Sequence, residues 1–327
     1  MTAPVPPHVT VVGEALIDLV PSGDPLTFKA KEGGSPLNVA VGLARLGVRT
    51  SLMARLGDNA FGRVLRHYLE SESVDLAASV SAPEPTTLAV VSLDPAGNAV
   101  YDFYTDGTAD WQWSHEELEL IPPDTTVVHF GSIAAWTDPG WLHIVNLVEE
   151  LHADGHVLVS YDPNVRPRLC GSRDQATSRI ERAVSSSHLV KVSAEDLSWL
   201  YPGKAPAGVA QDWIELGAEL VVVTSGASGA SAYRRDGIAV TRPAAPVGIV
   251  DTVGAGDSFS AAFLAALCEA AYGSPASIAL IESEALDEAL GYAVIASSIT
   301  CSRSGANPPT SAEMTIALGA ASENMSI

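Results

Sequence analysis

The chain has 327 residues, of which 47% are hydrophobic and 17% charged. This length and composition are typical of one large α/β domain or two medium-sized ones, and they exclude a disordered protein. The formal net charge of −21, with only four lysines, argues against a basic surface for nucleic acid or an anionic membrane.

The cysteines and the N-terminus point to a cytoplasmic protein. Cys170, Cys268 and Cys301 lie far apart and form no Cys-x-x-Cys pair, which favours reduced thiols. The first residues lack the basic and apolar regions of a signal peptide, and no run of about 18 apolar residues predicts a membrane span.

The N-terminal part alternates between strand and helix patterns, as in a parallel α/β protein. Strands are expected at Val9–Val12 and Thr50–Arg55, and helices at Val39–Leu46 and Arg63–Ser71. Asp18 interrupts the apolar run 14–20. It either lies at the solvent end of a strand or binds ligand hydroxyl groups at the carboxyl edge of a sheet.

A double glycine, Gly33-Gly34, precedes the first helix and permits a ligand to approach the backbone closely. Asn38 stands near the helix start. We expect it chiefly as an N-cap, with a ligand-facing amide as the alternative.

Two β-rich runs at 86–93 and 99–104 flank Asp94-Pro-Ala-Gly-Asn98, which is a hairpin signal. Consecutive hairpin strands do not fit a βαβ rhythm, so they predict a small antiparallel appendage inserted from about 14–32 and 86–112. Trp111 and Trp113 follow it and are expected to pack in the core.

The α/β rhythm then resumes, which predicts one continuous domain over 1–327 with a small β appendage. Strands are expected at 127–131, 157–161, 189–193, 219–224 and 246–250, a hairpin at 230–234 and 238–242, and helices at 139–154, 180–187, 194–200, 209–216, 258–267 and 288–301.

The run Asp251-Thr-Val-Gly-Ala-Gly-Asp257 opens one of these helices. A Gly-Ala-Gly turn at a helix start exposes N–H groups without intrahelical partners, and with the helix dipole they form an anion site. Asp257 in such a site is either a base that takes a proton or a plain N-cap. Both interpretations remain open from this segment alone.

Several expected strands end in polar or glycine-rich residues, which predicts a single cleft at one edge of the sheet. These are Asp18, Gly33, Gly34, Asp162, Lys191, Gly226 and the run 251–257. A P-loop is absent, since Gly203-Lys204 precedes Ala-Pro. Phe259 stands where a dinucleotide fingerprint needs its third glycine, and no Gly-x-Ser-x-Gly or His-Glu-x-x-His occurs.

Two motifs resemble those of the ribokinase-like, PfkB-type carbohydrate kinases. Gly33-Gly-Ser-Pro-Leu-Asn38, with Gly47 and Gly57, is similar to the N-terminal signature of that family, and Asp251–Asp257 to the C-terminal one. The resemblance covers nearly the whole chain. It implies ATP-dependent phosphorylation of a sugar hydroxyl on a Rossmann-like α/β sheet with a β-sheet lid, a Mg²⁺ requirement and a bound monovalent cation such as K⁺.

The resemblance also implies roles for individual positions. Asp257 would be the base, and the N–H groups of Gly254, Ala255 and Gly256 would hold the transferring phosphoryl group. Sugar would be bound by Asp18, Gly33, Gly34, Asn38 and Arg166, and ATP by Lys191, Ser193, Thr224, Gly226 and Gly229. The monovalent cation would lie near Asp251, Val253, Thr300, Arg303 and Gly305.

One motif departs from the family pattern. The Asn-x-x-Glu motif that organises Mg²⁺ aligns with Ser193-Ala-Glu195-Asp196, so Asp196 keeps a carboxylate, Glu195 is a second candidate, and Ser193 replaces the amide. Because Mg²⁺ held through water tolerates such changes, we expect activity to be retained.

The segments 14–20, 162–167 and 191–197 are most similar to fructokinases. Fructose is therefore the expected acceptor, with 2-keto-3-deoxygluconate and ribose as alternatives. A catalytically silent sugar-binding relative is the alternative of another class, against which the intact Asp257 argues. The appendage is also expected to pair with its copy in a homodimer.

Overall fold

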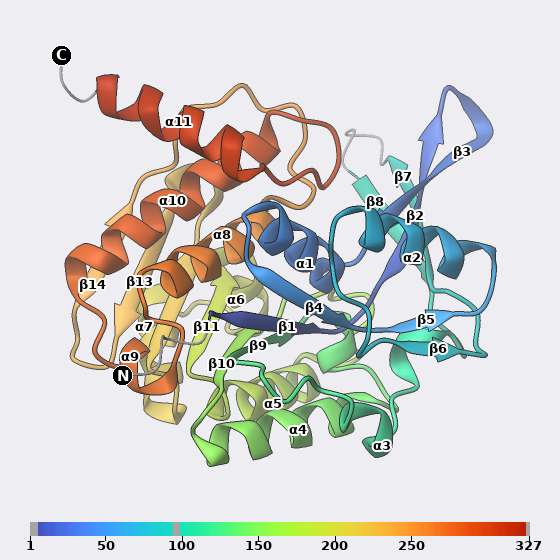
Figure 1. Cartoon of the computed structure of the whole chain (residues 1–327), viewed down its shortest axis with the longest axis horizontal. Coiled ribbons are helices and arrows are strands. Elements are labelled where there is room, and N and C mark those ends of the chain that lie inside the picture. Colours follow the sequence, from blue (N-terminus) through green and yellow to red (C-terminus); the bar gives the residue numbers. More distant parts are fainter. Residues whose placement is uncertain (1–5, 94–98, 325–327) are drawn as a thin grey trace.

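The computed structural model describes residues 6–93 and 99–324, so residues 1–5 and the turn expected at Asp94–Asn98 lie outside the described part. An eight-stranded sheet forms its centre, with helices on both faces (Figure 1). The strand order is β14 (Ala239–Arg242), β13 (Ala230–Arg234), β12 (Leu220–Thr224), β11 (Leu189–Ser193), β10 (Leu158–Asp162), β9 (Val127–Gly131), β1 (His8–Val12) and β4 (Arg49–Met53).

The six strands from β12 to β4 run parallel, and β13 and β14 add an antiparallel edge. Parallel strands buried on both faces are expected to be apolar throughout, and β1, β9 and β10 are fully buried. All parallel strands therefore present their carboxyl ends at one edge of the sheet.

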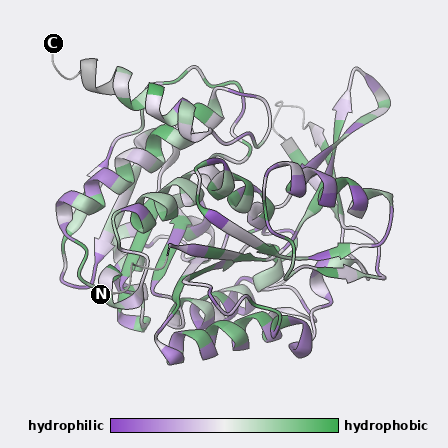
Figure 2. Ribbon diagram, viewed as in Figure 1, coloured by the Kyte–Doolittle hydropathy of each residue, from purple (hydrophilic) through white to green (hydrophobic). Residues whose placement is uncertain are grey.

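Successive strand residues pack against different helical layers because side chains alternate across a strand. On one face, Leu220 and Val222 join a cluster with α1 (Ser35–Arg45), α8 (Ala255–Glu269) and α10 (Ser283–Cys301). On the other, Val221 and Val223 join the layer of α4 (Trp141–Asp154), α5 (Arg173–Ser185), α6 (Ala194–Leu200) and α7 (Pro206–Leu216). Figure 2 shows that α4 combines hydrophobic and hydrophilic residues, as a helix with one outward face should.

The appendage is a four-stranded sheet that reaches away from the body (Figure 1). Its order is β3 (Asp24–Gly33), β2 (Leu16–Ser22), β7 (Leu88–Leu93) and β8 (Ala99–Tyr104). β7 and β8 are antiparallel, as the hairpin signal predicts, but β2 and β7 are parallel. Most of β3 lies within the first part of the expected insertion, residues 14–32.

The remaining elements are short or peripheral. They are β5 (Arg55–Gly57), β6 (Val80–Ala82), α2 (Ala60–Ser71), α3 (His115–Leu118), α9 (Pro275–Ile278), α11 (Ser311–Asn324) and the 3-10 turns η1 (Ala109–Trp111), η2 (Ile133–Ala135) and η3 (Gly226–Ser228). Trp111 and Trp113 are buried in the core, as predicted. No helix in the described ranges is long and apolar enough to cross a bilayer.

Two local predictions were wrong. Residues 246–250 form an irregular loop rather than a strand, and Ile249 and Val250 are exposed. Asn38 is not the N-cap of α1, because Gly34 occupies that position and Pro36 lies in the first turn. The Asn38 N–H is instead bonded to the Gly34 carbonyl, at 2.9 Å, inside the helix.

Candidate active site

Two cavities meet at the N-terminus of α8, and Thr252 and Gly256 line both of them. The polar cavity, about 290 Å³, is lined by Glu14, Leu16, Asp18, Gly34, Ser35, Asn38, Tyr101, Phe103, Ser132, Ile133, Asn164, Arg166, Lys191, Val253, Gly254 and Asp257. The apolar cavity, about 430 Å³, is lined by Thr224, Gly226, Ala227, Gly229, Ala244, Ala245, Pro246, Val247, Ile249, Ala255, Phe259, Val294, Ser297, Ser298 and Cys301. The single cleft expected from sequence is thus a pair of adjoining cavities.

Asp257 lies in the first turn of α8, where two groups of α1 hold its carboxylate. Ser35 donates a hydrogen bond to Oδ1 at 2.6 Å, and the Asn38 amide donates one to Oδ2 at 2.8 Å. Burial raises the pKa of Asp257, while these two hydrogen bonds and Lys191 lower it. The carboxylate is therefore fixed in orientation at the edge of the polar cavity. Gly254, in a left-handed conformation, is the N-cap residue.

The start of α8 leaves backbone donors available. Ala255 donates its N–H to the Thr252 carbonyl at 3.2 Å. Within the described residues, the N–H groups of Gly254, Gly256 and Asp257 have no hydrogen-bond acceptor. Unpaired donors at a helix N-terminus attract an anion, so this turn can hold a phosphoryl group.

Lys191 supplies a positive charge next to the same turn. Its Nζ would lie 3.0 Å from a Cβ placed on Gly256, so a side chain there would push Lys191 back by a few tenths of an ångström. Nζ also donates to Asp162 Oδ2 at 2.8 Å, and both side chains are buried. Burial lowers the pKa of Lys191, but the charge and hydrogen bond of Asp162, together with the charges of Asp257 and Asp196, shift it upward overall.

Asp18 and Arg166 belong to the polar cavity as well. Burial raises the pKa of Asp18 to about 6, Arg166 lowers it, and Asp257 raises it further. Gly33 packs directly against this carboxylate, since a Cβ there would meet Asp18 Oδ2 at 2.5 Å. A Cβ on Gly34 would meet the Glu14 carbonyl at 2.7 Å.

The Ser193–Asp196 segment lies beside the site, outside the residues that line the two cavities as described. Ser193 caps α6 by accepting the Asp196 N–H at 2.9 Å. Burial and then the charge of Asp162 raise the pKa of Asp196 to about 6, so this carboxylate is near Lys191 and Asp162. Glu195 is exposed. Across the described ranges, no group of three acidic, histidine or cysteine side chains is placed to hold a metal ion.

The five residues expected around a monovalent cation are brought together in part. Asp251 accepts the Val253 N–H at 3.0 Å and the Gly305 N–H at 2.8 Å, which ties the two loops to each other. Thr300 is buried and donates to the Ala296 carbonyl. The Arg303 side chain points elsewhere, to Glu313 at 2.5 Å.

Sequence reasoning missed several groups in the polar cavity: Glu14, Ser35, Tyr101, Phe103, Ser132 and Asn164. Ser35 lies inside the Gly33–Asn38 motif and could have been found there. Glu14 and Asn164 lie in the segments 14–20 and 162–167, whose resemblance to fructokinases could have pointed to them. Ser132, Tyr101 and Phe103 lie after β9 and on β8, where no motif was found.

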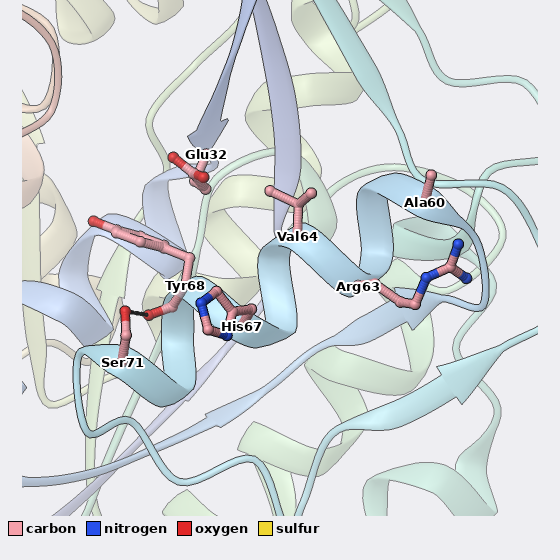
Figure 3. A pocket seen from close by; sticks show the side chains of 7 residues that line it. All are labelled: Glu32, Ala60, Arg63, Val64, His67, Tyr68 and Ser71. Carbon is pink, nitrogen blue, oxygen red and sulfur yellow. Dashed lines mark hydrogen bonds between the residues drawn. The ribbon is translucent and has the colours of Figure 1, made fainter.

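A third hollow lies outside this site. It is an open groove of about 490 Å³ on α2, lined by Glu32, Ala60, Arg63, Val64, His67, Tyr68 and Ser71 (Figure 3). The only hydrogen bond drawn between these residues joins the Ser71 hydroxyl to the Tyr68 carbonyl, at 2.7 Å. Nothing in the groove resembles the constellation around Asp257.

The fold and the site define a sugar kinase. Residues 6–313 match the pfkB family of carbohydrate kinases, and the chain belongs to that family. It is therefore an enzyme that transfers a phosphoryl group to a hydroxyl.

Its relatives include several fructokinases. It is 37% identical to a fructokinase of Rhizobium leguminosarum bv. trifolii over 258 residues, which cover 78% of each protein. It is 34% identical to fructokinase-1 of Oryza sativa subsp. japonica over 321 residues, or 94% of this chain and 96% of that protein. The fructokinase of Xylella fastidiosa, solved with bound ATP, superposes with a TM-score of 0.88 at 26% identity, covering 96% of this chain and 99% of that one.

A double mutant of fructokinase from Vibrio cholerae was solved with fructose, ADP and potassium ion. It superposes with a TM-score of 0.83 at 27% identity, covering 95% of this chain and 97% of that one.

Proposed function

We propose that this enzyme transfers the γ-phosphoryl group of ATP to a hydroxyl of fructose, with Asp257 as the base. The observation that carries the proposal is the position of Asp257, held by Ser35 and Asn38 where the polar and apolar cavities meet. A sugar in the polar cavity and a nucleotide in the apolar one would bring their reacting ends together at the start of α8. The catalytically silent alternative has no need of a carboxylate fixed at that junction.

Phosphoryl transfer requires chiefly that the reactants be positioned and that the charge of the transferring group be stabilised, and each site residue would have one of these roles. Asp257 accepts the proton of the attacking hydroxyl. The N–H groups of the Gly254–Asp257 turn, including that of Ala255 once it leaves Thr252, bind the oxygens of the transferring group, and Lys191 adds a positive charge beside them. Asp18, Gly33, Gly34, Asn38 and Arg166 orient the sugar.

The charges of the polar cavity favour a neutral sugar over a sugar acid. Three acidic side chains, Glu14, Asp18 and Asp257, line it against two cations, and burial raises the pKa of each acid, that of Glu14 to about 7. Of the cations, Lys191 is already paired with Asp162, which leaves Arg166. A bound 2-keto-3-deoxygluconate would add another negative charge to this set, and like charges in a desolvated cavity repel. The fructokinase relatives point the same way.

The apolar cavity suits the nucleotide. Small and apolar side chains form most of its walls, and Thr224, Gly226, Gly229 and Gly256 line it as well. Gly226 and Gly229 both have positive φ, which lets the backbone turn close to a ligand. Ser193 remains a weaker ATP candidate, since its hydroxyl already caps α6.

Two metal sites accompany this proposal. Mg²⁺ would be held through water near Asp196, with Glu195 less suitably placed, and would neutralise charge between the phosphates. A monovalent cation such as K⁺ would lie by Asp251, Val253, Thr300 and Gly305, where one carboxylate joins two loops. The arginine at 303 would contribute only its backbone.

The small sheet would act as a lid and as a dimer contact. β2 carries Leu16 and Asp18, and β8 carries Tyr101 and Phe103, so four side chains of this sheet line the polar cavity. β3 is an edge strand on which Leu26 and Phe28 are exposed, a combination that favours pairing with a second copy. Three free cysteines and the need for ATP support a cytoplasmic location.

A panel of acceptors tests the proposal. Purified enzyme with ATP and Mg²⁺ is assayed for ADP release with fructose, 2-keto-3-deoxygluconate, ribose and glucose. Fructose should give the highest kcat/KM by at least about tenfold, which corresponds to about 1.4 kcal/mol of transition-state binding. A higher kcat/KM for 2-keto-3-deoxygluconate or ribose would overturn the choice of fructose, and no ADP release with any sugar would favour the silent relative.

A further inference from the structure

Ser132 has a backbone conformation that residues with a side chain rarely adopt. Its φ of 54° and ψ of −155° fall in a region that is essentially reserved for glycine. It is buried, follows β9 directly, and lines the polar cavity. Strain of this kind persists only where the surroundings impose it, and it gathers at functional sites.

Contacts between neighbouring strand ends impose the conformation. The Ser132 N–H donates to the Asp162 carbonyl at 2.9 Å, and the Ser132 carbonyl accepts the Ala135 N–H at 3.1 Å. Gly131 packs so closely on the Asp162 carbonyl that no Cβ would fit. The backbone path is therefore fixed whichever residue stands at 132, and glycine would follow it with less strain.

The feature that serine adds to this path is its hydroxyl. The Asn164 amide donates a hydrogen bond to the hydroxyl at 3.5 Å, a long distance, and the serine oxygen has a second lone pair that can accept a hydrogen bond from a ligand. Glu14 lies alongside: its Oε2 accepts the Ala134 N–H at 3.2 Å, and burial raises its pKa while a hydrogen bond with the Ser132 hydroxyl lowers it. Both neighbours also line the polar cavity.

We propose that Ser132 binds the acceptor sugar, its hydroxyl forming a hydrogen bond with one sugar hydroxyl while Glu14 and Asn164 hold it in place. The inference rests on the proposed function of the polar cavity. Residues that follow the carboxyl ends of β1, β9 and β10 then help to recognise the sugar, in addition to the groups around Asp257. Glu14 acts on the sugar through Ser132 and is a positioning residue.

Replacement of Ser132 by glycine separates this role from a structural one, because it removes the hydroxyl and relieves the strain together. We expect the KM for the sugar to rise about tenfold, as for the loss of one hydrogen bond. The kcat should stay within about twofold, because a contact made equally in ground and transition states changes only KM. The KM for ATP should not change, and Tm should stay within about 3 °C of wild type.

Ser73 offers a matched control. It is also a serine with positive φ, at 62°, but it is exposed and follows α2 outside both cavities. Ser73→Gly makes the same chemical change at another serine with positive φ and should alter neither kinetic constant. Ser132→Ala keeps the Cβ and should raise the sugar KM like Ser132→Gly, which covers the case in which the glycine variant folds poorly.

Fructose analogues that each lack one hydroxyl identify the bond. For one analogue, wild type and Ser132→Ala should have the same KM, because the hydroxyl that Ser132 binds is already missing. An unchanged fructose KM in both variants would overturn the proposal, as would a KM raised equally for every analogue. Wild-type turnover of fructose reports separately on the proposed function: if another sugar is preferred, the same comparison is made with that sugar.

Discussion

The buried pair Lys191–Asp162 allows stability and catalysis to be separated. Nζ lies 2.8 Å from Oδ2, and the side chains are 9% and 4% exposed. Replacing Lys191 by methionine keeps the apolar stem but leaves the carboxylate buried without its partner. Loss of one member of such a pair costs about 3–5 kcal/mol of unfolding free energy.

The chain contains a pair of the same types at its surface. Lys204 Nζ lies 2.9 Å from Asp212 Oδ2, with side chains 56% and 54% exposed. Because solvent screens exposed pairs, Lys204→Met should cost about 0–1 kcal/mol. The difference in the free energy of unfolding between the two lysine variants, measured by urea denaturation at pH 7, gives the effect of burial on the pair.

A double variant separates the contribution of Lys191 to stability from its contribution to catalysis. Asp162→Asn removes the stranded charge and keeps Oδ1, which accepts the Asn164 N–H at 3.1 Å. Asp162→Asn/Lys191→Met should therefore recover most of the lost stability. Its kcat/KM for ATP should stay about 100-fold or more below wild type, because the cation beside Gly256 is still missing. Equal stability of the two lysine variants, or recovery of activity together with stability, would refute this reasoning.

Three further predictions concern other parts of the site. Gly256→Ala should lower kcat/KM about tenfold, because the added Cβ would lie 3.0 Å from Lys191 Nζ and displace it slightly. Its free energy of unfolding in urea should stay within about 1 kcal/mol of wild type, because the helix preference of alanine offsets the disturbed Lys191–Asp162 pair. Gly208→Ala, in open space on α7, is the control and should keep full activity. Burial raises the pKa of Glu14 to about 7, so between about pH 4.5 and 7 the folded state binds more protons than the unfolded state, and this contribution to stability is lost as the pH rises. From pH 5 to pH 8, the free energy of unfolding of Glu14→Gln in urea should increase relative to that of wild type by on the order of 1–3 kcal/mol. An equal difference between the two proteins at both pH values would contradict this. Replacing K⁺ by tetramethylammonium should lower kcat for wild type but not for Asp251→Asn, whose activity should already be low; equal dependence in both would place the cation elsewhere.

The sequence predicted the main sheet well because its signals are local. A strand buried on both faces is a short apolar run, and β9, β10, β11 and β12 were placed within a residue or two. The same signal failed at 246–250, where valine and isoleucine suggested a strand. Among the described strands none pairs with this segment, which forms a loop along the apolar cavity.

Site residues were predicted where the two sequence motifs come together around Asp257. They were missed where contacts between distant segments determine which side chains line the cavity. Asp257, Asn38 and Lys191 are brought together as expected, although Asn38 reaches Asp257 from within the helix rather than capping it. Ser132 could not have been found, since its conformation arises from the packing of β9 against β10 and leaves no pattern in the sequence. The contributions of Glu14 and of β8 to the polar cavity likewise depend on how distant segments meet.

The most direct test of the account is the Asp257→Asn variant, assayed for ADP release with ATP, Mg²⁺ and fructose, and for binding of each substrate by calorimetry. Asparagine keeps an acceptor for Ser35 but cannot take the proton of the sugar hydroxyl. The account predicts that turnover falls by a factor of about 10² to 10⁴ while both dissociation constants stay within a few-fold of wild type. Turnover near the wild-type rate, with both substrates bound, would show that Asp257 is not the base.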